Sequence, residues 1–268
     1  MSNLVDKFLK IYIEKLKYFN YSKHTVRDYS HYFEKFLIDR NKYPQHLTSK
    51  DFEEYLLNYS YSSLSQQNQI INALKFGYDK VLNKKYNKID FQRPRKQKSL
   101  PQVIDKEYLL SKISTIKNLK HKAIISLAYS VGLRVSEVCN LKIEDIDSKR
   151  MIINIRQAKG NKDRIVPLSE NILILLREYY KEHKPKEHLF NGQNSLKYSH
   201  TSCNKIVKKY LGEQYHFHQL RHSSFTSLLE AGTDLRIIQK IAGHQNVKST
   251  EIYTHVSNQT LSKVNLPI

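Results

Sequence analysis

The sequence predicts a mainly α-helical protein with a small antiparallel β-sheet, divided into a helical N-terminal domain and a larger α+β domain. Three observations lead to this fold class. The chain has 268 residues, enough for one large domain or two ordinary ones. Apolar residues recur at helical spacing through the first 82 residues, with no convincing alternation of period two. Beyond Pro101 the pattern changes, and two strand-like segments appear among further helices.

Four amphipathic stretches predict the helices of the N-terminal domain. Thr48 is a plausible N-cap of the third stretch. We expect the aromatic side chains of these stretches to form a core rather than a platform for stacking bases. The apolar positions are Val5, Phe8, Leu9, Tyr12 and Leu16; Val26, Tyr29, Phe33, Phe36 and Leu37; Phe52, Tyr55 and Leu56; and Ile70, Leu74, Tyr78 and Val81.

The second half predicts a mixed domain. Apolar residues at helical spacing in 123–131 indicate a helix that Gly132 would stop. A short helix containing Arg134, Glu137 and Val138 follows directly. Strand-like segments at 151–155 and 164–166 flank residues 159–162, which have the chemistry of a hairpin turn, and further helices are expected at 170–180, 201–210, 219–230 and 234–242.

The chain is strongly basic. It has 45 Lys and Arg against 25 Asp and Glu, a formal net charge of +20. Residues 1–100 carry 19 of these bases and 10 of the acids, so the excess belongs to both halves of the chain. Because such an excess repels itself in the folded state, a polyanion that contacts both halves, most simply nucleic acid, is the expected partner. A highly soluble basic protein, or a ribosome-associated one, is the alternative.

Residues 84–98 form a basic segment that contains Pro94 and a single acidic residue, Asp90. We expect an exposed linker that lies along a phosphate backbone, although a merely solvated hinge fits equally well. The predicted division is a helical domain at 1–91, a linker at 92–103 and a larger α+β domain at 104–268 with a tail at 257–268. The expected DNA-binding residues are Arg93, Arg95, Lys96, Lys98 and, in the hairpin, Lys162.

Other classes of protein are not expected. The mean hydropathy is −0.61, and no stretch approaches the roughly 20 apolar residues that cross a bilayer. The N-terminal residues lack the basic and apolar regions of a signal peptide. Two cysteines, Cys139 and Cys203, cannot form a disulfide scaffold or a cysteine-based zinc site. The sequence therefore predicts a soluble, reduced, cytoplasmic protein.

Several motifs, in order and at matching spacing, resemble the tyrosine recombinase (phage integrase) family, and in particular its compact bacterial Xer-type and integron-related members. The N-terminal domain resembles the core-binding domain of that family more weakly, through residues 22–25 and Tyr29. The matching segments are Gly132–Leu141, Ala158–Leu168, His218–His222, Leu228–Gly232, Ala242–His244 and Thr250–Val256.

The resemblance implies a SAM-like N-terminal domain followed by a recombinase catalytic domain, and a site-specific DNA recombinase. Such an enzyme cleaves and rejoins DNA through a 3′-phosphotyrosine intermediate and a Holliday junction. It implies six catalytic residues, and it implies Glu137 as the residue that holds the guanidinium of Arg134. The six residues are Arg134, Lys159, His218, Arg221, His244 and Tyr253.

The chemistry explains these residue types. Attack on a phosphodiester raises its charge from about −1 towards −2 in the transition state, so fixed positive donors such as Arg134 and Arg221 stabilise it. Tyr253 would be the nucleophile, with His218 accepting its proton or bonding the phosphate. By the resemblance, His244 would donate to a nonbridging oxygen and Lys159 would protonate the 5′-oxygen leaving group.

No cofactor is expected. His216, His218 and His222 cluster, as do His183 and His188, but they lack the acidic or cysteine partners of a closed metal site. No P-loop or dinucleotide-binding glycine pattern is visible, so neither ATP nor NAD is expected.

The expected partners are double-stranded recombination sites and three further copies of the chain on DNA, with a monomer possible in solution and an accessory protein possible. The tail at 257–268 would dock on a neighbouring protomer. The alternatives are a type IB topoisomerase-like enzyme that only nicks and closes a strand, a catalytically silent DNA-binding relative, and a structural nucleic-acid protein.

Overall fold

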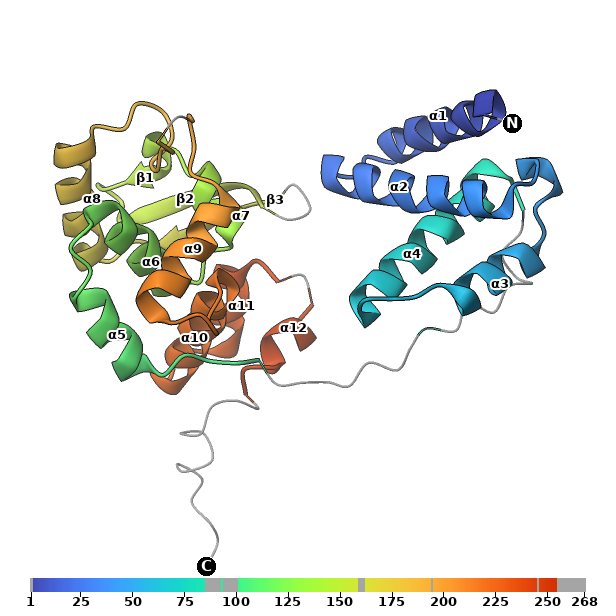
Figure 1. Cartoon of the computed structure of the whole chain (residues 1–268). Helices are drawn as coiled ribbons and strands as arrows, with labels where there is room; N and C mark the ends of the chain where they lie inside the picture. The colour runs from blue at the N-terminus through green and yellow to red at the C-terminus, as the bar shows by residue number, and fades with distance from the viewer. Residues whose placement is uncertain are drawn as a thin grey trace, which may run out of the picture. The chain divides into compact units, whose positions relative to one another are not determined.

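The computed structural model describes residues 2–84, 93, 101–158, 162–193, 195–244 and 246–254. The chain divides into two compact units, residues 1–98 and residues 99–268. The fold is mainly helical, with one three-stranded antiparallel sheet in the second unit (Figure 1), which confirms the predicted fold class.

The first unit contains the four predicted helices. They are α1 (Ser2–Tyr18), α2 (Lys23–Arg40), α3 (Ser49–Asn58) and α4 (Leu64–Phe76). A 3-10 turn, η1 (Pro44–His46), precedes α3, and a π-helical turn, η2 (Gly77–Val81), follows α4. The predicted apolar stripe that ends at Val81 therefore continues past the end of the α-helix. A Cβ at Gly77 would overlap the ring of Phe33, so the glycine lets α2 and η2 approach closely.

The core of the first unit is aromatic, as the sequence predicts. Tyr12, Phe33, Phe36 and Phe52 are fully buried. The rings of Tyr12 and Phe33 stack with centroids 4.3 Å apart, and those of Phe36 and Phe52 also lie 4.3 Å apart. The Tyr12 hydroxyl donates to the carbonyl oxygen of Ala73 over 2.9 Å, so its burial leaves no unpaired polar group.

Thr48 is the N-cap of α3, as predicted. The backbone N–H of Thr48 donates to the carboxylate of Asp51 over 2.8 Å, and so does its hydroxyl, which pairs groups that the helix start leaves without a partner.

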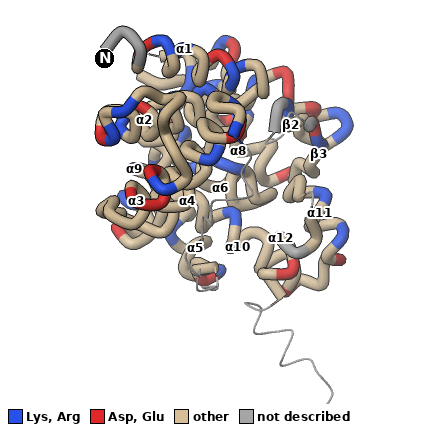
Figure 2. The backbone as a smooth tube through the Cα atoms, turned by 90° about the vertical axis from the view of Figure 1, so that its right-hand side faces the viewer, with Lys and Arg blue, Asp and Glu red and all other residues tan. Residues whose placement is uncertain are grey.

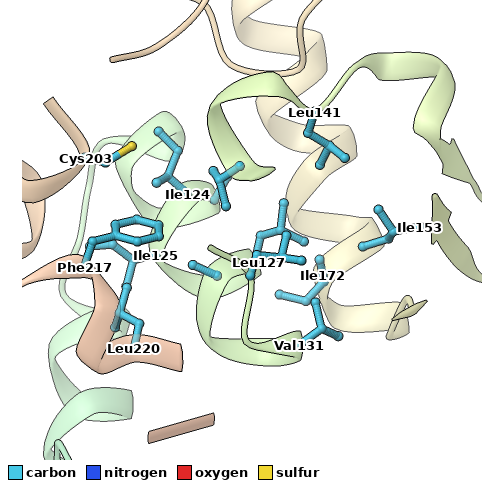
Figure 3. Close-up of a cluster of buried hydrophobic side chains, with 14 of the residues drawn as sticks. Ile124, Ile125, Leu127, Val131, Leu141, Ile153, Ile172, Cys203, Phe217 and Leu220 are labelled. Carbon is cyan, nitrogen blue, oxygen red and sulfur yellow. The ribbon is translucent and has the colours of Figure 1, made fainter. Parts of the chain in front are cut away.

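The second unit is built around α6 (Leu119–Val131), as Figure 3 shows. Side chains of α8 (Glu170–His183), α9 (His200–Leu211), α10 (Phe217–Glu230) and the sheet converge on this helix. The labelled side chains are Ile124, Ile125, Leu127 and Val131 from α6 itself, together with Leu141, Ile153, Ile172, Cys203, Phe217 and Leu220. Burial of this apolar surface stabilises the unit that carries most of the predicted site residues.

The sheet consists of β1 (Ile146–Asp147), β2 (Ile152–Ala158) and β3 (Lys162–Pro167), in that order and antiparallel. The predicted strands at 151–155 and 164–166 are confirmed as β2 and β3. Ile153 pairs with Val166, and the register shifts between Ile155 and Ala158. The two-residue β1 is too short to show an alternating pattern, which is why the sequence did not predict it.

The remaining helices are α5 (Lys106–Ser114), α7 (Val135–Asn140), α11 (Leu235–Ala242) and α12 (Lys248–Glu251), with a 3-10 turn, η4 (Ile143–Asp145). The four helices predicted between 170 and 242 are confirmed, with ends that differ by a few residues. The sequence analysis did not predict α5 or α12.

Lys and Arg are spread over the elements of both units rather than gathered in one segment (Figure 2). Within the described ranges, no helix is long and apolar enough to cross a membrane. Cys139 and Cys203 are both free and buried, with their sulfur atoms 3.6 Å apart.

Candidate active site

The ends of two helices hold Arg221. This residue lies within α10 and is 1% exposed, so its guanidinium requires acceptors inside the protein. Nη1 donates to the carbonyl oxygen of Gly132 at the end of α6, and Nη2 donates to that of Ala242 at the end of α11, both over 2.6 Å. Helix ends leave such carbonyls without an intrahelical partner, and these carbonyls carry negative partial charge. The fold therefore fixes the position of this guanidinium.

The turn after α6 places Arg134 beside Arg221. Gly132 ends α6 in the left-handed conformation, with φ of 63°, as the sequence predicts. A Cβ at this position would lie 2.5 Å from the ring of Phe225 in α10. Arg134 follows as the N-cap of α7 with extended backbone, so it precedes the helix that was predicted to contain it. Its charge is among the causes that shift the pKa of Arg221, so the two guanidinium groups lie close together.

Glu137 is held by two arginines. Its Oε1 accepts from Arg134 Nη1 over 2.8 Å and from Arg164 Nη1 over 2.7 Å. Its Oε2 accepts from the backbone N–H of Arg134 and from Arg164 Nη2, both over 2.8 Å. Burial alone would raise the pKa of Glu137, but the hydrogen bonds and charge of Arg164 and the hydrogen bonds of Arg134 lower it to about 2. The predicted contact between Glu137 and Arg134 is present.

Arg164 joins three elements of the site. It lies on β3, its guanidinium forms a two-pronged pair with Glu137 of α7, and its Nε donates to the carbonyl oxygen of Ile241 in α11 over 2.7 Å. A Cβ at Gly243 would lie 3.0 Å from its Cδ, so the glycine that ends α11 also makes room for this side chain. Only 8% of the Arg164 side chain is exposed. Its contacts connect β3, a strand of the predicted hairpin, to α7 and α11.

His244 follows the left-handed end of α11 at Gly243. Its Nε2 lies 3.1 Å from Arg221 Nη2, and its Nδ1 lies 2.9 Å from the Thr250 hydroxyl. A guanidinium only donates, so Nε2 is the acceptor and Nδ1 carries the proton. Burial, followed by the charges of Arg221 and its neighbours, lowers the pKa of His244 to about 4. The predicted donation from His244 to a phosphate stays a prediction, because Nε2 is an acceptor in this structure.

One face of α10 carries the next part of the site. His218, Arg221, His222 and Phe225 are spaced by three and four residues, which places them along a single helix face. The Arg221 guanidinium lies over the Phe225 ring, 4.7 Å from its centroid. The rings of His218 and His222 meet edge to face, with centroids 4.6 Å apart.

Tyr253 lies two residues beyond α12 and packs on this face. It is 1% exposed, and its ring centroid is 5.4 Å from that of Phe225. Its hydroxyl lies 3.2 Å from Nδ1 of His222. Burial raises the pKa of Tyr253, while the charges of Arg221 and Arg134 oppose that rise. The phenolic oxygen therefore lies within the electric field of both guanidinium groups.

The site carries an excess of positive charge. The charges of Arg134 and Arg164 both disfavour the charge of Arg221, and Glu137 is the carboxylate among the causes that shift the pKa of Arg221. Burial, and then the charge of Arg134, lower that pKa to about 9, so Arg221 keeps its charge at neutral pH in an unfavourable environment. An anion between these groups would relieve that repulsion. Three guanidinium groups and one carboxylate suit a ligand whose own charge becomes more negative as it reacts.

Five of the six predicted catalytic residues are described: Arg134, His218, Arg221, His244 and Tyr253. The second unit brings them together through the contacts above. The sixth, Lys159, lies outside the described residues, as do Arg95, Lys96, Lys98 and the tail at 257–268. Lys162 begins β3, but its side chain is not described.

Arg93 lies in the first unit. Its guanidinium donates to the side-chain oxygens of Asn68 and Asn72 on α4, over 3.2 and 2.7 Å. Its predicted contact with DNA stays a prediction.

Two residues that the sequence analysis did not assign belong to this constellation. Arg164 shares a strand face with the buried Val166, whereas Ile165 between them is 57% exposed. A charged residue on the buried face of a strand requires a partner, and that period-two pattern could have revealed it. His222, one turn after His218, was considered only as a metal ligand. Within the described parts of the chain, no three His, Cys, Asp or Glu side chains are placed to hold a metal ion.

The chain matches known proteins over most of its length. Residues 102–260 match the family model "Phage integrase family", and residues 8–88 match "Phage integrase, N-terminal SAM-like domain". Among curated relatives, a protein described as tyrosine recombinase XerA from Pyrococcus horikoshii is 37% identical over 249 residues, covering 90% of this chain and 86% of the relative. A tyrosine recombinase XerC from Staphylococcus haemolyticus is 32% identical over 279 residues, covering 92% and 91%.

Solved structures show the same arrangement of elements. A crystal structure of XerA recombinase is 30% identical with a TM-score of 0.56, covering 97% of this chain and 96% of that one. XerH bound to its difH substrate in a pre-cleavage complex is 23% identical with a TM-score of 0.72, covering 91% and 79%. At that identity the second match shows the fold alone.

Proposed function

This chain belongs to the phage integrase family and is a tyrosine recombinase of the Xer type, and we propose that it recombines specific double-stranded DNA sites by cleaving and rejoining their strands. The observation that supports this most directly is the convergence of the partly exposed Arg134 with the buried Arg221 and Tyr253 in one site. A phenol beside two fixed guanidinium groups is the arrangement that phosphoryl transfer to tyrosine requires.

The reaction begins with attack of the Tyr253 oxygen on a DNA phosphorus. The new bond joins that oxygen to phosphorus, and the bond from phosphorus to the 5′-oxygen breaks. Arg134 and Arg221 bind the nonbridging oxygens, whose charge grows in the transition state. The ester of the 3′-phosphate with tyrosine keeps the energy of the broken bond, so rejoining needs neither a metal ion nor ATP.

The other residues serve this step. We assign Lys159 as the acid that protonates the leaving 5′-oxygen, His218 as the proton acceptor or phosphate ligand, and His244 as a further phosphate donor. Glu137 orients Arg134, because a carboxylate saturated by hydrogen bonds holds a guanidinium in one direction. A family likeness over most of the chain supports this assignment, residue by residue, on the matching motifs.

We propose that both units bind DNA and that four copies assemble on two sites. The net charge of +20 extends over both units, which suits a polyanion that contacts each of them. Known structures of XerH are described as bound to difH substrate before cleavage and to palindromic difH after cleavage. A tetramer would exchange the strands in pairs through a Holliday junction.

A strand-exchange assay tests the function. Because the target is unknown, duplexes are first selected from a random pool with Tyr253→Phe, which binds but cannot attack. Two labelled copies of a selected duplex, of different lengths, are then incubated with the wild-type protein. Recombination produces two strands of new length. Relaxation of a supercoiled plasmid that carries the site, without strands of new length, would instead indicate a topoisomerase-like enzyme.

A further inference from the structure

The hydroxyl of Tyr253 contacts a side chain to which the proposed mechanism gives no role. That side chain is His222, whose Nδ1 lies 3.2 Å from the phenolic oxygen. The two rings are tilted by 49°, with centroids 5.8 Å apart, so the contact is made through the polar atoms rather than by stacking.

The direction of this hydrogen bond follows from burial. Tyr253 is 1% exposed, and burial raises its pKa, so the phenol is protonated at neutral pH and its O–H needs an acceptor. Burial, and then the charges of His218, Arg221 and His216, lower the pKa of His222 to about 4. The neutral ring therefore accepts at Nδ1 and carries its proton at Nε2.

His218 occupies a different place. It lies one helical turn earlier on α10 and is exposed, and its ring meets the ring of His222 rather than Tyr253. Among the described residues, no hydrogen bond joins His218 to the phenol. An exposed histidine beside Arg134 and Arg221 can reach an incoming phosphate, whereas His222 lies against the nucleophile itself.

We propose that His222 is the residue that accepts the proton of Tyr253 during DNA cleavage and returns it during rejoining, which leaves His218 to bind the phosphate. This inference rests on the proposed function, because it deepens the assignment of Tyr253 as the nucleophile. The family resemblance gives His218 two alternative tasks, accepting the tyrosine proton or binding the phosphate. In this proposal His222 has the first task and His218 the second.

The step balances in both directions. As the phenolic oxygen bonds to phosphorus, its proton moves to Nδ1 of His222, which becomes an imidazolium. The 5′-oxygen leaves with the electron pair of the broken bond and takes a proton from the leaving-group acid, assigned to Lys159. In rejoining, the 5′-hydroxyl attacks and gives its proton back to that base. The tyrosine oxygen then leaves and recovers its proton from His222.

The charges around His222 make it a weak base in the free protein and a stronger one when DNA is bound. His218, Arg221 and His216 disfavour a positive charge on His222 in the free protein, so it is ready as an acceptor but a weak base. A DNA phosphate that binds Arg221 and Arg134 brings negative charge close to His222 and increases its affinity for a proton. The base therefore becomes stronger when the substrate is in place.

The test is the rate of covalent adduct formation on a nicked suicide duplex of a selected site, measured in a single turnover from pH 6 to pH 9. His222→Asn keeps an acceptor near the position of Nδ1 but cannot take a proton, and His222→Ala removes both. His200→Asn is the matched control, because this exposed histidine at the start of α9 lies in the same unit and has no described contact with Tyr253 or His222. Melting temperature and affinity for the duplex are measured for each variant.

We expect both His222 variants to form the adduct about 100-fold or more slowly at pH 7, while duplex affinity is unchanged and His200→Asn matches the wild type. The deficit should shrink about tenfold for each unit of pH, since hydroxide then takes the proton in place of histidine. A His222→Asn rate within threefold of the wild type, or a deficit that does not change with pH, would overturn the inference alone. Failure of the wild type to form any adduct would overturn the proposed function together with it.

Discussion

At the scale of single residues, Glu137 and Arg164 show how hydrogen bonds compensate for the desolvation of a buried charge. Each carboxylate oxygen of Glu137 accepts from two donors, and Arg164 uses its remaining Nε on a helix-end carbonyl. A charge paired in this way stabilises the fold only while all partners remain, because the isolated group would be desolvated without compensation. Arg134 is thereby held in one direction, as the proposed reaction requires.

Arg164→Ala should lower the free energy of unfolding by about 3–5 kcal/mol, because it leaves Glu137 buried with half of its partners. Lys208→Ala is the control in the same unit: its pair with Glu213 is exposed and should contribute no more than about 1 kcal/mol. Urea unfolding measures both changes. Equal losses of unfolding free energy in the two variants would show that the buried contacts of Arg164 do not stabilise the fold.

The buried histidines predict a loss of stability in mild acid. The pKa values of His222 and His244 are about 4 in the folded protein, against 6.5 in a free side chain. Between these values the unfolded chain binds more protons than the folded one, so stability falls as the pH drops from about 6.5 to 4. Glu137 acts in a lower window, from about 4.5 to 2, because its pKa is lowered.

Melting temperatures at pH 7 and pH 5 measure this effect. The wild type should melt at a lower temperature at pH 5, and His222→Asn should show a smaller difference. A melting temperature that is unchanged or higher at pH 5 would contradict the buried, neutral state of these rings.

Among elements, helix ends rather than helix middles build most of the site. The ends of α6 and α11 supply the carbonyls for Arg221 and Arg164, and the left-handed residues Gly132 and Gly243 turn the chain there. The sequence predicted the helices from their periodicity and the end of α6 from its glycine. It could not predict that two distant helix ends meet around one guanidinium, because that depends on tertiary packing.

The sequence also predicted part of the candidate site. The motifs located Arg134, Arg221 and Tyr253, and the structure brings them together. His222 and Arg164 escaped assignment for physical reasons. A histidine directly after Arg221 has no distinctive spacing of its own, and a single charge in a short strand becomes informative only when its buried face is known.

Alanine substitutions at Gly132 and Gly232 distinguish the energetic cost of backbone strain from that of steric overlap. Gly132 and Gly232 both have positive φ, 63° and 84°, so alanine at either position costs about 1–2 kcal/mol in backbone energy. A Cβ at Gly132 also meets the Phe225 ring at 2.5 Å, whereas nothing lies within 4 Å of one at Gly232. Gly132→Ala should therefore destabilise the protein by about 1–3 kcal/mol more than Gly232→Ala in urea unfolding. Equal losses would show that the overlap with Phe225 is relieved without cost.

For the whole molecule, the proposal that both positively charged units bind DNA predicts a strong dependence of affinity on salt. With 6–10 phosphate contacts, affinity should fall about 10³–10⁵-fold between 50 and 200 mM salt. If Arg93 contacts one phosphate, as predicted, Arg93→Ala should reduce the slope of log affinity against log salt by about one. Titrations of a labelled duplex by fluorescence anisotropy measure both slopes. An unchanged slope in Arg93→Ala would show that Arg93 makes no phosphate contact and stays bound to Asn68 and Asn72 when DNA binds.

The central claim is that the Tyr253 oxygen becomes covalently joined to a DNA 3′-phosphate. Mass spectrometry of a protease digest, after reaction with a nicked suicide duplex, measures this most directly. We predict a single peptide that contains Tyr253 and carries a nucleotide through its 3′-phosphate, absent from both Tyr253→Phe and Arg221→Ala. A nucleotide on any other tyrosine, or a linkage through the 5′-phosphate, would contradict the account.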